Sequence, residues 1–125
     1  MPDGHEIVIP APARMLTTNA ERRLHWSQRA EIVRLWRVAA WAGAVAARPG
    51  LAALSAAEID AYPVQRGGVL ADPGAHAPIV KAAVDGLVDA KVLPDDSPTF
   101  LRALRIHPPV RGAAALVLVV TEAPS

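Results

Sequence analysis

Aspartates in the middle of the chain gather around one apolar, helix-like segment, residues 78–92. They are Asp72 before it, Asp85 and Asp89 within it, and the pair Asp95 and Asp96 after it. Magnesium prefers carboxylate oxygens and keeps several waters, so two or three converging aspartates are sufficient ligands. A metal held in this way activates water and stabilises the leaving oxygen of a phosphodiester. This arrangement is therefore compatible with metal-assisted phosphodiester hydrolysis.

Lys81 stands four residues before Asp85, and this spacing places both side chains on one face of a helix. A cation would then lie beside the carboxylates. The same residues suit a second interpretation, in which Asp72 and Asp95 belong to turns or helix ends and Lys81 forms a surface ion pair with Asp85. Spacing alone favours the second interpretation, and both remain open at this point.

Basic and acidic residues are segregated along the chain, although the net charge is only +1. The first 48 residues carry seven arginines against four acids, which gives +3. Residues 49–98 carry three basic and seven acidic residues, which gives −4, and residues 99–125 carry three arginines and one acid, which gives +2. An acidic middle between basic flanks suits a metal-dependent enzyme that acts on a polyanion. Surface charges scattered by chance explain the distribution equally well.

The hydrophobic pattern predicts six main elements that would position these side chains. They are a strand at 6–9, a helix at 26–47, a strand at 57–64, a helix at 78–92, and strands at 100–106 and 113–121. Residues 11–23 are predicted as a loop, and the last two strands as a hairpin. The fold class that follows is α+β, with a small mixed β-sheet covered by two helices in the order β-α-β-α-β-β. The length fits a single domain over residues 1–125.

The predicted first helix has an apolar arc and a basic arc. On a helical wheel the apolar arc consists of Ile32, Leu35, Trp36, Ala39 and Gly43. The basic arc consists of Arg29, Arg34 and Arg37, with Trp26 and Trp41 near it. One face is therefore expected to pack on the core, and the other to face solvent or a polyanion.

Composition excludes several function classes. The chain has no cysteine, which rules out disulfides and thiolate zinc sites and suits a reducing cytoplasm. Its longest apolar runs are about half the roughly 20 residues that span a bilayer, and its start does not resemble an export signal. No phosphate-binding loop is present, Ser97 has no evident base, and the four histidines lack metal-ligand spacing. We expect a soluble, cytoplasmic protein without a nucleotide cofactor.

Residues 81–96, with the sequence KAAVDGLVDAKVLPDD, are the most specific stretch of the chain. They resemble a helix and turn of the RusA-like Holliday-junction resolvases, in which Lys-Ala-x-x-Asp-x-Leu leads to a terminal Asp-Asp pair at the same spacing. Residues 72–78 (DPGAHAP) are similar to the Asp-Pro-x-Asn form of the family's acidic motif. Residues 19–26 resemble its basic amino-terminal segment, and residues 116–122 its last strand. The resemblance runs nearly end to end.

The resemblance implies a RusA-like fold and the activity of a crossover junction endodeoxyribonuclease. Such a protein is a homodimer that binds four-way (Holliday) DNA junctions and cuts them with Mg²⁺ in recombination and repair, and twofold symmetry suits paired cuts. Asp72 and Asp96 would be metal ligands and catalytic residues, with Asp95 assisting at the metal. Lys81 would act in catalysis or contact phosphate, supported by Asp85. The implied DNA-binding residues are Arg22, Arg23, Arg29, Arg34, Arg37 and Arg66.

The acidic motif departs from the family pattern at two positions. Gly74 stands where the second Asp is common, and Ala75 where the Asn is common. One carboxylate and one amide are missing, and His76 is the nearest residue that offers a substitute ligand. An alternative function is therefore a non-catalytic relative that binds junctions. A third alternative is an interaction protein that pairs an exposed apolar carboxyl-terminal strand with a partner.

Overall fold

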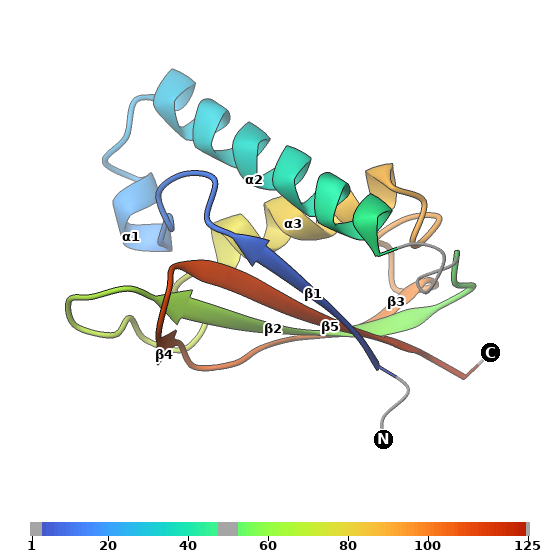
Figure 1. Cartoon of the computed structure of the whole chain (residues 1–125). Helices are drawn as coiled ribbons and strands as arrows, with labels where there is room; N and C mark the ends of the chain where they lie inside the picture. Colours follow the sequence, from blue (N-terminus) through green and yellow to red (C-terminus); the bar gives the residue numbers. More distant parts are fainter. Residues whose placement is uncertain (1–3, 48–52, 125) are drawn as a thin grey trace.

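A computed structural model describes residues 4–47 and 53–124 of the chain. Its helices pack on a mixed five-stranded sheet (Figure 1). The elements are β1 (Gly4–Pro10), α1 (Thr18–Glu21), α2 (Trp26–Ala46), β2 (Ala57–Gln65), α3 (Ala77–Asp89), β3 (Leu101–Ile106), β4 (Val110–Arg111) and β5 (Ala115–Glu122). The two long helices and four long strands follow the predicted order β-α-β-α-β-β, so the predicted α+β class is confirmed. No helix in the two described ranges has the length and apolar character needed to cross a bilayer.

Two short elements are added to the predicted ones. Residues 11–23, predicted as a loop, contain the four-residue helix α1, so the described residues form three helices and not two. The side chain of Thr17 accepts a hydrogen bond from the Ala20 amide and caps this helix at its start. The two-residue strand β4 pairs with the end of β2.

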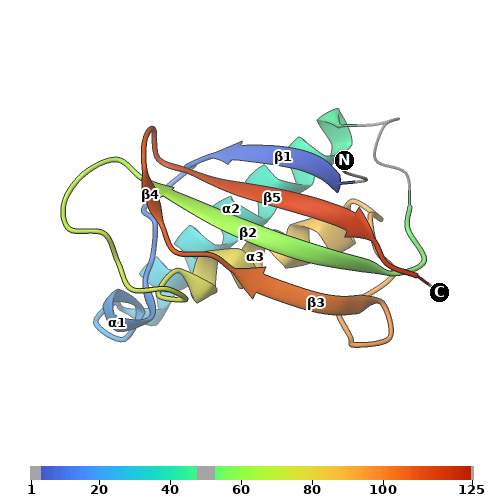
Figure 2. The same ribbon diagram turned by 90° about the horizontal axis from the view of Figure 1, so that it is seen from below.

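The strand order in the sheet is β1-β5-β2-β3 (Figure 2). Strand β5 runs antiparallel to both β1 and β2, whereas β3 and β4 run parallel to β2. The predicted hairpin between residues 100–106 and 113–121 is therefore wrong, because β2 lies between these strands. After β3 the chain stays on the same edge of β2, where the His107 amide donates to the Ala61 carbonyl oxygen and β4 follows. Only then does it turn back as β5 on the other edge of β2.

Strand β5 lies inside the sheet with a partner on each side. Its residues Leu116, Leu118 and Val120 are buried beneath the helices. The hypothesis that an exposed carboxyl-terminal strand pairs with a partner is therefore wrong, since both edges of β5 are already hydrogen-bonded.

The core lies between the sheet and the pair α2 and α3. Trp36 is its largest member, and its indole N–H donates to the carbonyl oxygen of Arg14 at 3.0 Å, which satisfies the polar atom of a buried side chain. The fully buried residues of α2 are Trp36, Ala40 and Ala44, whereas Ile32 and the rest of the predicted arc are partly buried. Trp26 is 69% exposed and Trp41 is 44% exposed, as expected for positions near the basic arc.

Helix α3 ends at Asp89, three residues before the predicted end. The Val92 amide donates to the Leu87 carbonyl oxygen and the Lys91 amide to that of Val88. With Lys91 at φ 66°, this pattern is a Schellman motif, which usually has glycine at the left-handed position. The motif turns the chain inward, and Val92 and Leu93 are buried in the core.

Helices α2 and α3 are in close contact at Gly86, which is buried. A Cβ atom at this position would overlap the carbonyl oxygen of Arg37 and would lie 2.9 Å from the Ala40 Cβ and 3.0 Å from the Trp41 nitrogen. These neighbours are mainly backbone atoms, which cannot rotate away. The contact therefore requires glycine.

Gly86→Ala is expected to lower the free energy of unfolding by about 1–3 kcal/mol, because overpacking outweighs the roughly 1 kcal/mol by which alanine favours a helix. Urea unfolding at fixed pH measures the change. Gly67→Ala is the matched control, because a Cβ there meets no atom within 4 Å. A Gly86→Ala variant as stable as the Gly67→Ala variant would contradict the prediction.

Candidate nucleic-acid interface

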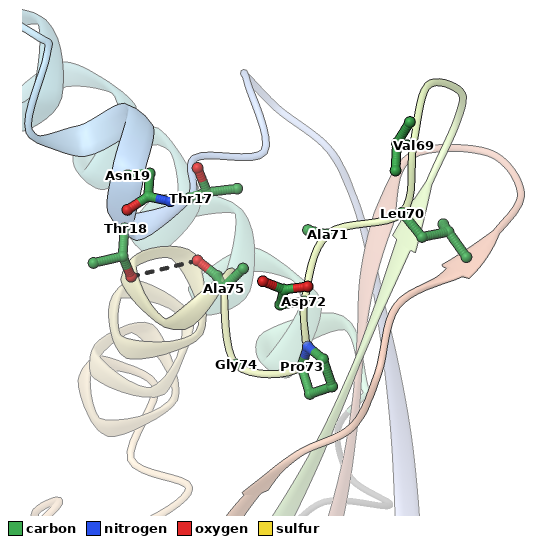
Figure 3. A pocket seen from close by; sticks show the side chains of 10 residues that line it. All are labelled: Thr17, Thr18, Asn19, Val69, Leu70, Ala71, Asp72, Pro73, Gly74 and Ala75. Atoms are coloured by element: carbon green, nitrogen blue, oxygen red, sulfur yellow. Dashed lines mark hydrogen bonds between the residues drawn. The ribbon is translucent and has the colours of Figure 1, made fainter.

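A pocket of about 540 Å³ lies between the start of α1 and the loop that precedes α3 (Figure 3). Residues 17–19 line one side and residues 69–75 the other, with Asp72 among them. The Thr18 amide donates to the Ala75 carbonyl oxygen at 2.9 Å, and its hydroxyl points to the same oxygen at 3.5 Å. This contact joins the two walls across more than fifty residues of sequence.

The loop before α3 is held in shape by hydrogen bonds from its own backbone and from β2. The Ala75 amide donates to the Asp72 carbonyl oxygen at 3.0 Å, and Gly74 has φ +81°, in the left-handed region that favours glycine. Gln65, the last residue of β2, accepts from the Ala71 amide at 2.7 Å and donates to the Val69 carbonyl oxygen at 3.3 Å. Sequence reasoning missed Gln65, since no periodicity marks a side chain that ties down its own loop.

Lys81 connects α3 to the turn that follows it. Its Nζ lies 3.1 Å from Asp85 and 2.5 Å from Asp96. Hydrogen bonds to Asp96 and then to Asp85 raise the pKa of Lys81, and the Lys81 ammonium lowers the pKa of Asp96. Lys81 is therefore a cation at neutral pH and not a free amine. The predicted Lys81–Asp85 contact is present, and Asp96 joins it.

The residues present do not fit a magnesium site built from three protein ligands. Across residues 4–47 and 53–124, no three or more His, Cys, Asp or Glu side chains are placed to hold a metal ion together. Asp72, Asp95 and Asp96 therefore do not form such a group. Lys81 lies where a cation would contact Asp96, and Asp72 is the one carboxylate among the residues that line the pocket.

Half of the six predicted DNA-binding arginines already contact a carboxylate. Arg29 lies 4.0 Å from Glu21, Arg34 lies 2.6 Å from Glu31, and Arg37 lies 2.6 Å from Asp89. The other three, Arg22, Arg23 and Arg66, are exposed and have no ion pair with any residue in the described parts of the chain. In the chain, Arg22 and Arg23 come directly after α1, whose start forms one wall of the pocket. Arg66 comes directly after β2 and begins the loop that forms the other wall.

A second polar cluster lies on the sheet face away from the helices. The His107 Nε2 lies 2.8 Å from Asp60, and its ring stacks on Tyr62 at 4.2 Å. Arg105 also contacts Asp60, at 3.6 Å, and pairs with Glu58. Arg105 on β3 thus contacts two carboxylates of β2, so the cluster ties the edge strand β3 to its neighbour.

His76 is buried just before α3, with 2% of its surface exposed. Its Nδ1 has no hydrogen-bond partner, and burial lowers its pKa below the usual 6.5. The imidazole is therefore neutral at pH 7. No metal-binding group of three in the described ranges includes His76, so its role as a substitute ligand has no structural support.

Comparisons with protein-family models and with curated proteins give no match for this chain. The resemblance to RusA-like proteins therefore depends on the quoted motifs alone.

His76 makes stability depend on pH in a defined direction. Because its pKa is lower in the folded chain, the unfolded chain takes up the proton first, and the free energy of unfolding falls as the pH drops below about 6.5. The loss stops once the folded chain is also protonated. Thermal or urea unfolding between pH 5.5 and 7.5 measures it.

His76→Leu is the matched variant, because it places an apolar side chain of similar size there and removes the titrating group. Its stability is expected to change less over this pH range than that of the wild type. Equal pH dependence of the two proteins would show that another group titrates.

Proposed function

We propose that this chain is a RusA-like protein that binds four-way DNA junctions as a homodimer, without magnesium-dependent cleavage. The observation that carries the proposal is the position in the chain of three of the arginines that have no ion pair in the described ranges, Arg22, Arg23 and Arg66. Arg22 and Arg23 follow the helix that provides one wall of the pocket, and Arg66 opens the loop that provides the other. When an arginine neutralises a phosphate, the DNA releases a condensed counterion, and this release supplies much of the affinity for DNA. An arginine without an acidic partner is free to make this contact. The family resemblance supports the choice of a four-way junction.

The second candidate is the magnesium-dependent junction endonuclease, a hydrolase with Asp72, Asp95 and Asp96 at the metal. The contact of Lys81 with Asp96 favours it, because this contact brings the terminal Asp-Asp pair of the motif back to α3. The incomplete ligand set argues against it, since no carboxylate stands at Gly74. We therefore rank junction binding without cleavage above the endonuclease as the function of this chain.

A gel assay with a labelled four-way junction and a matched linear duplex, with and without magnesium, tests both candidates. Native gels are expected to show a shift of the junction that does not need magnesium, and denaturing gels no new cuts. Paired nicks in the junction that require magnesium would instead establish the endonuclease. Equal affinity for junction and duplex would overturn both.

Arg22→Ala combined with Arg23→Ala is expected to weaken junction binding and to reduce the dependence of log K on log salt, by about 0.9 for each phosphate that is no longer neutralised. Fluorescence anisotropy at several salt concentrations measures both quantities. Arg34→Ala is the control, because Arg34 is already neutralised by Glu31 and its removal is expected to cost less. Equal effects of the two changes would contradict the assignment of the unpaired arginines.

Gly74→Asp combined with Ala75→Asn restores the two missing residues of the family motif. We expect this variant to gain magnesium-dependent nicking of the junction. A Cβ at Gly74 meets no atom within 4 Å, and Asp tolerates positive φ better than most residues, although the strain costs about 1–2 kcal/mol. Gly74→Asn with Ala75→Asn is the control with the same shape and no added carboxylate. Absence of cleavage in both variants would count against a decayed metal site.

A further inference from the structure

The pocket offers hydrogen-bond acceptors that no other group in residues 4–47 and 53–124 uses. The carboxylate of Asp72 has no hydrogen bond or ion pair within the described ranges, and neither has the side-chain amide of Asn19. They come from opposite walls (Figure 3). Thr17 is different, because its hydroxyl caps α1, and Thr18 is directed at Ala75. A ligand in this pocket therefore meets one negative charge and one free amide.

The loop wall carries apolar residues close to Asp72. Val69 is 91% exposed, although Gln65 holds the loop that carries it, whereas the Leu70 side chain is turned away from Asp72 (Figure 3). Pro73 lines the pocket beside Asp72. An apolar edge held next to a polar acceptor suits a flat group that has a hydrophobic face and a polar rim. The volume, about 540 Å³, lies within the usual range for ligand sites.

The charge inside the pocket differs in sign from the charges on the chain segments next to its walls. Asp72 is the one charged side chain among the lining residues, so it repels a phosphate from the interior. Arg22, Arg23 and Arg66 attract phosphates to the segments that lead into the walls. A nucleic acid satisfies both conditions if its backbone follows the arginines and a neutral base enters the pocket. The base must be unpaired, because only then is its Watson–Crick edge free.

The geometry points to guanine as this base. We propose, on the basis of the proposed junction binding, that the pocket receives a guanine flipped out of its base pair at the branch point and that Asp72 reads it. Guanine presents two adjacent donors, N1–H and the N2 amino group, which match the two oxygens of a carboxylate. Adenine and cytosine each place a ring nitrogen acceptor beside their amino group, and thymine places carbonyl oxygens on both sides of its N–H. Each of these acceptors would face the charge of Asp72.

The test uses synthetic four-way junctions with one unpaired nucleotide at the branch point, which is guanine, inosine, adenine, cytosine or thymine. Anisotropy titrations in EDTA are expected to show that wild-type protein binds the guanine junction about tenfold more tightly than the adenine, cytosine and thymine junctions. Inosine keeps N1–H and lacks the amino group, so it is expected to lie between. Asp72→Asn is expected to abolish the preference for guanine, because an amide replaces one acceptor with a donor.

Glu122→Gln is the charge-matched control, since Glu122 is exposed at the far end of β5 and its change removes one negative charge without touching the pocket. It is expected to keep the guanine preference. Comparing bases within one variant cancels the uniform gain in affinity that follows when any negative charge is removed. Circular dichroism establishes that each variant is folded.

The outcomes separate this inference from the proposed function. Preference for junctions over duplexes with equal affinity for all five unpaired nucleotides would overturn the guanine site and leave junction binding intact. Loss of the junction preference would overturn the proposed function. A second experiment would then test whether the pocket binds guanine: free guanosine monophosphate and adenosine monophosphate are titrated separately, and the amide chemical shifts of residues 17–19 and 69–75 are followed. Shifts with guanosine alone support the inference, and equal or no shifts overturn it. A guanine preference that is absent in EDTA and appears only in a repeat titration with magnesium would also overturn it, because Asp72 would then act through a metal ion.

Discussion

Helix α3 lies against the backbone of α2 at Gly86, and this contact holds the two helices together as one layer on the sheet. The distance between the helices follows from the missing Cβ, which would otherwise overlap the carbonyl oxygen of Arg37. Ala40, opposite Gly86, is equally buried and small. On the exposed side of the same contact, Arg37 pairs with Asp89, and this surface ion pair adds little because it is solvated. Close packing therefore determines how the two helices lie against each other, and the ion pair at the surface contributes little to it.

The position of α3 determines where the pocket can form. Its first turn follows the buried His76, and the loop before it meets α1 through the hydrogen bond from Thr18 to Ala75. Gln65 ties the other end of this loop to β2. The pocket is thus an open depression bordered by segments anchored to a helix and to the sheet, which favours a preformed site over one that closes on its ligand.

Sequence reasoning succeeded where local rules decide structure and failed where distant contacts decide it. Helix α2 starts at Trp26 as predicted, and Lys81 meets Asp85 because a helical turn brings them together. Turn signals after β3 indicate that the chain reverses, but they do not say which edge of β2 the next strand joins, so the hairpin was predicted wrongly. The contact of Lys81 with Asp96 depends on the left-handed Lys91, and no propensity predicts a non-glycine residue there. The pocket joins segments about fifty residues apart, which no periodicity links.

If the arginines near the pocket bind phosphate, as we propose, the Asp72 carboxylate needs a partner with positive charge or hydrogen-bond donors. A metal ion and the donor edge of a base are the two partners that nucleic-acid chemistry supplies. A magnesium ion at the motif would take a second carboxylate beside Asp72, and here Lys81 engages Asp96 while Gly74 contributes no side chain. A base needs only the two oxygens of Asp72, an apolar face and freedom from competing partners. On our proposal, absence of the neighbouring carboxylate therefore changes what Asp72 selects, from a cation that drives hydrolysis to a base that identifies the junction.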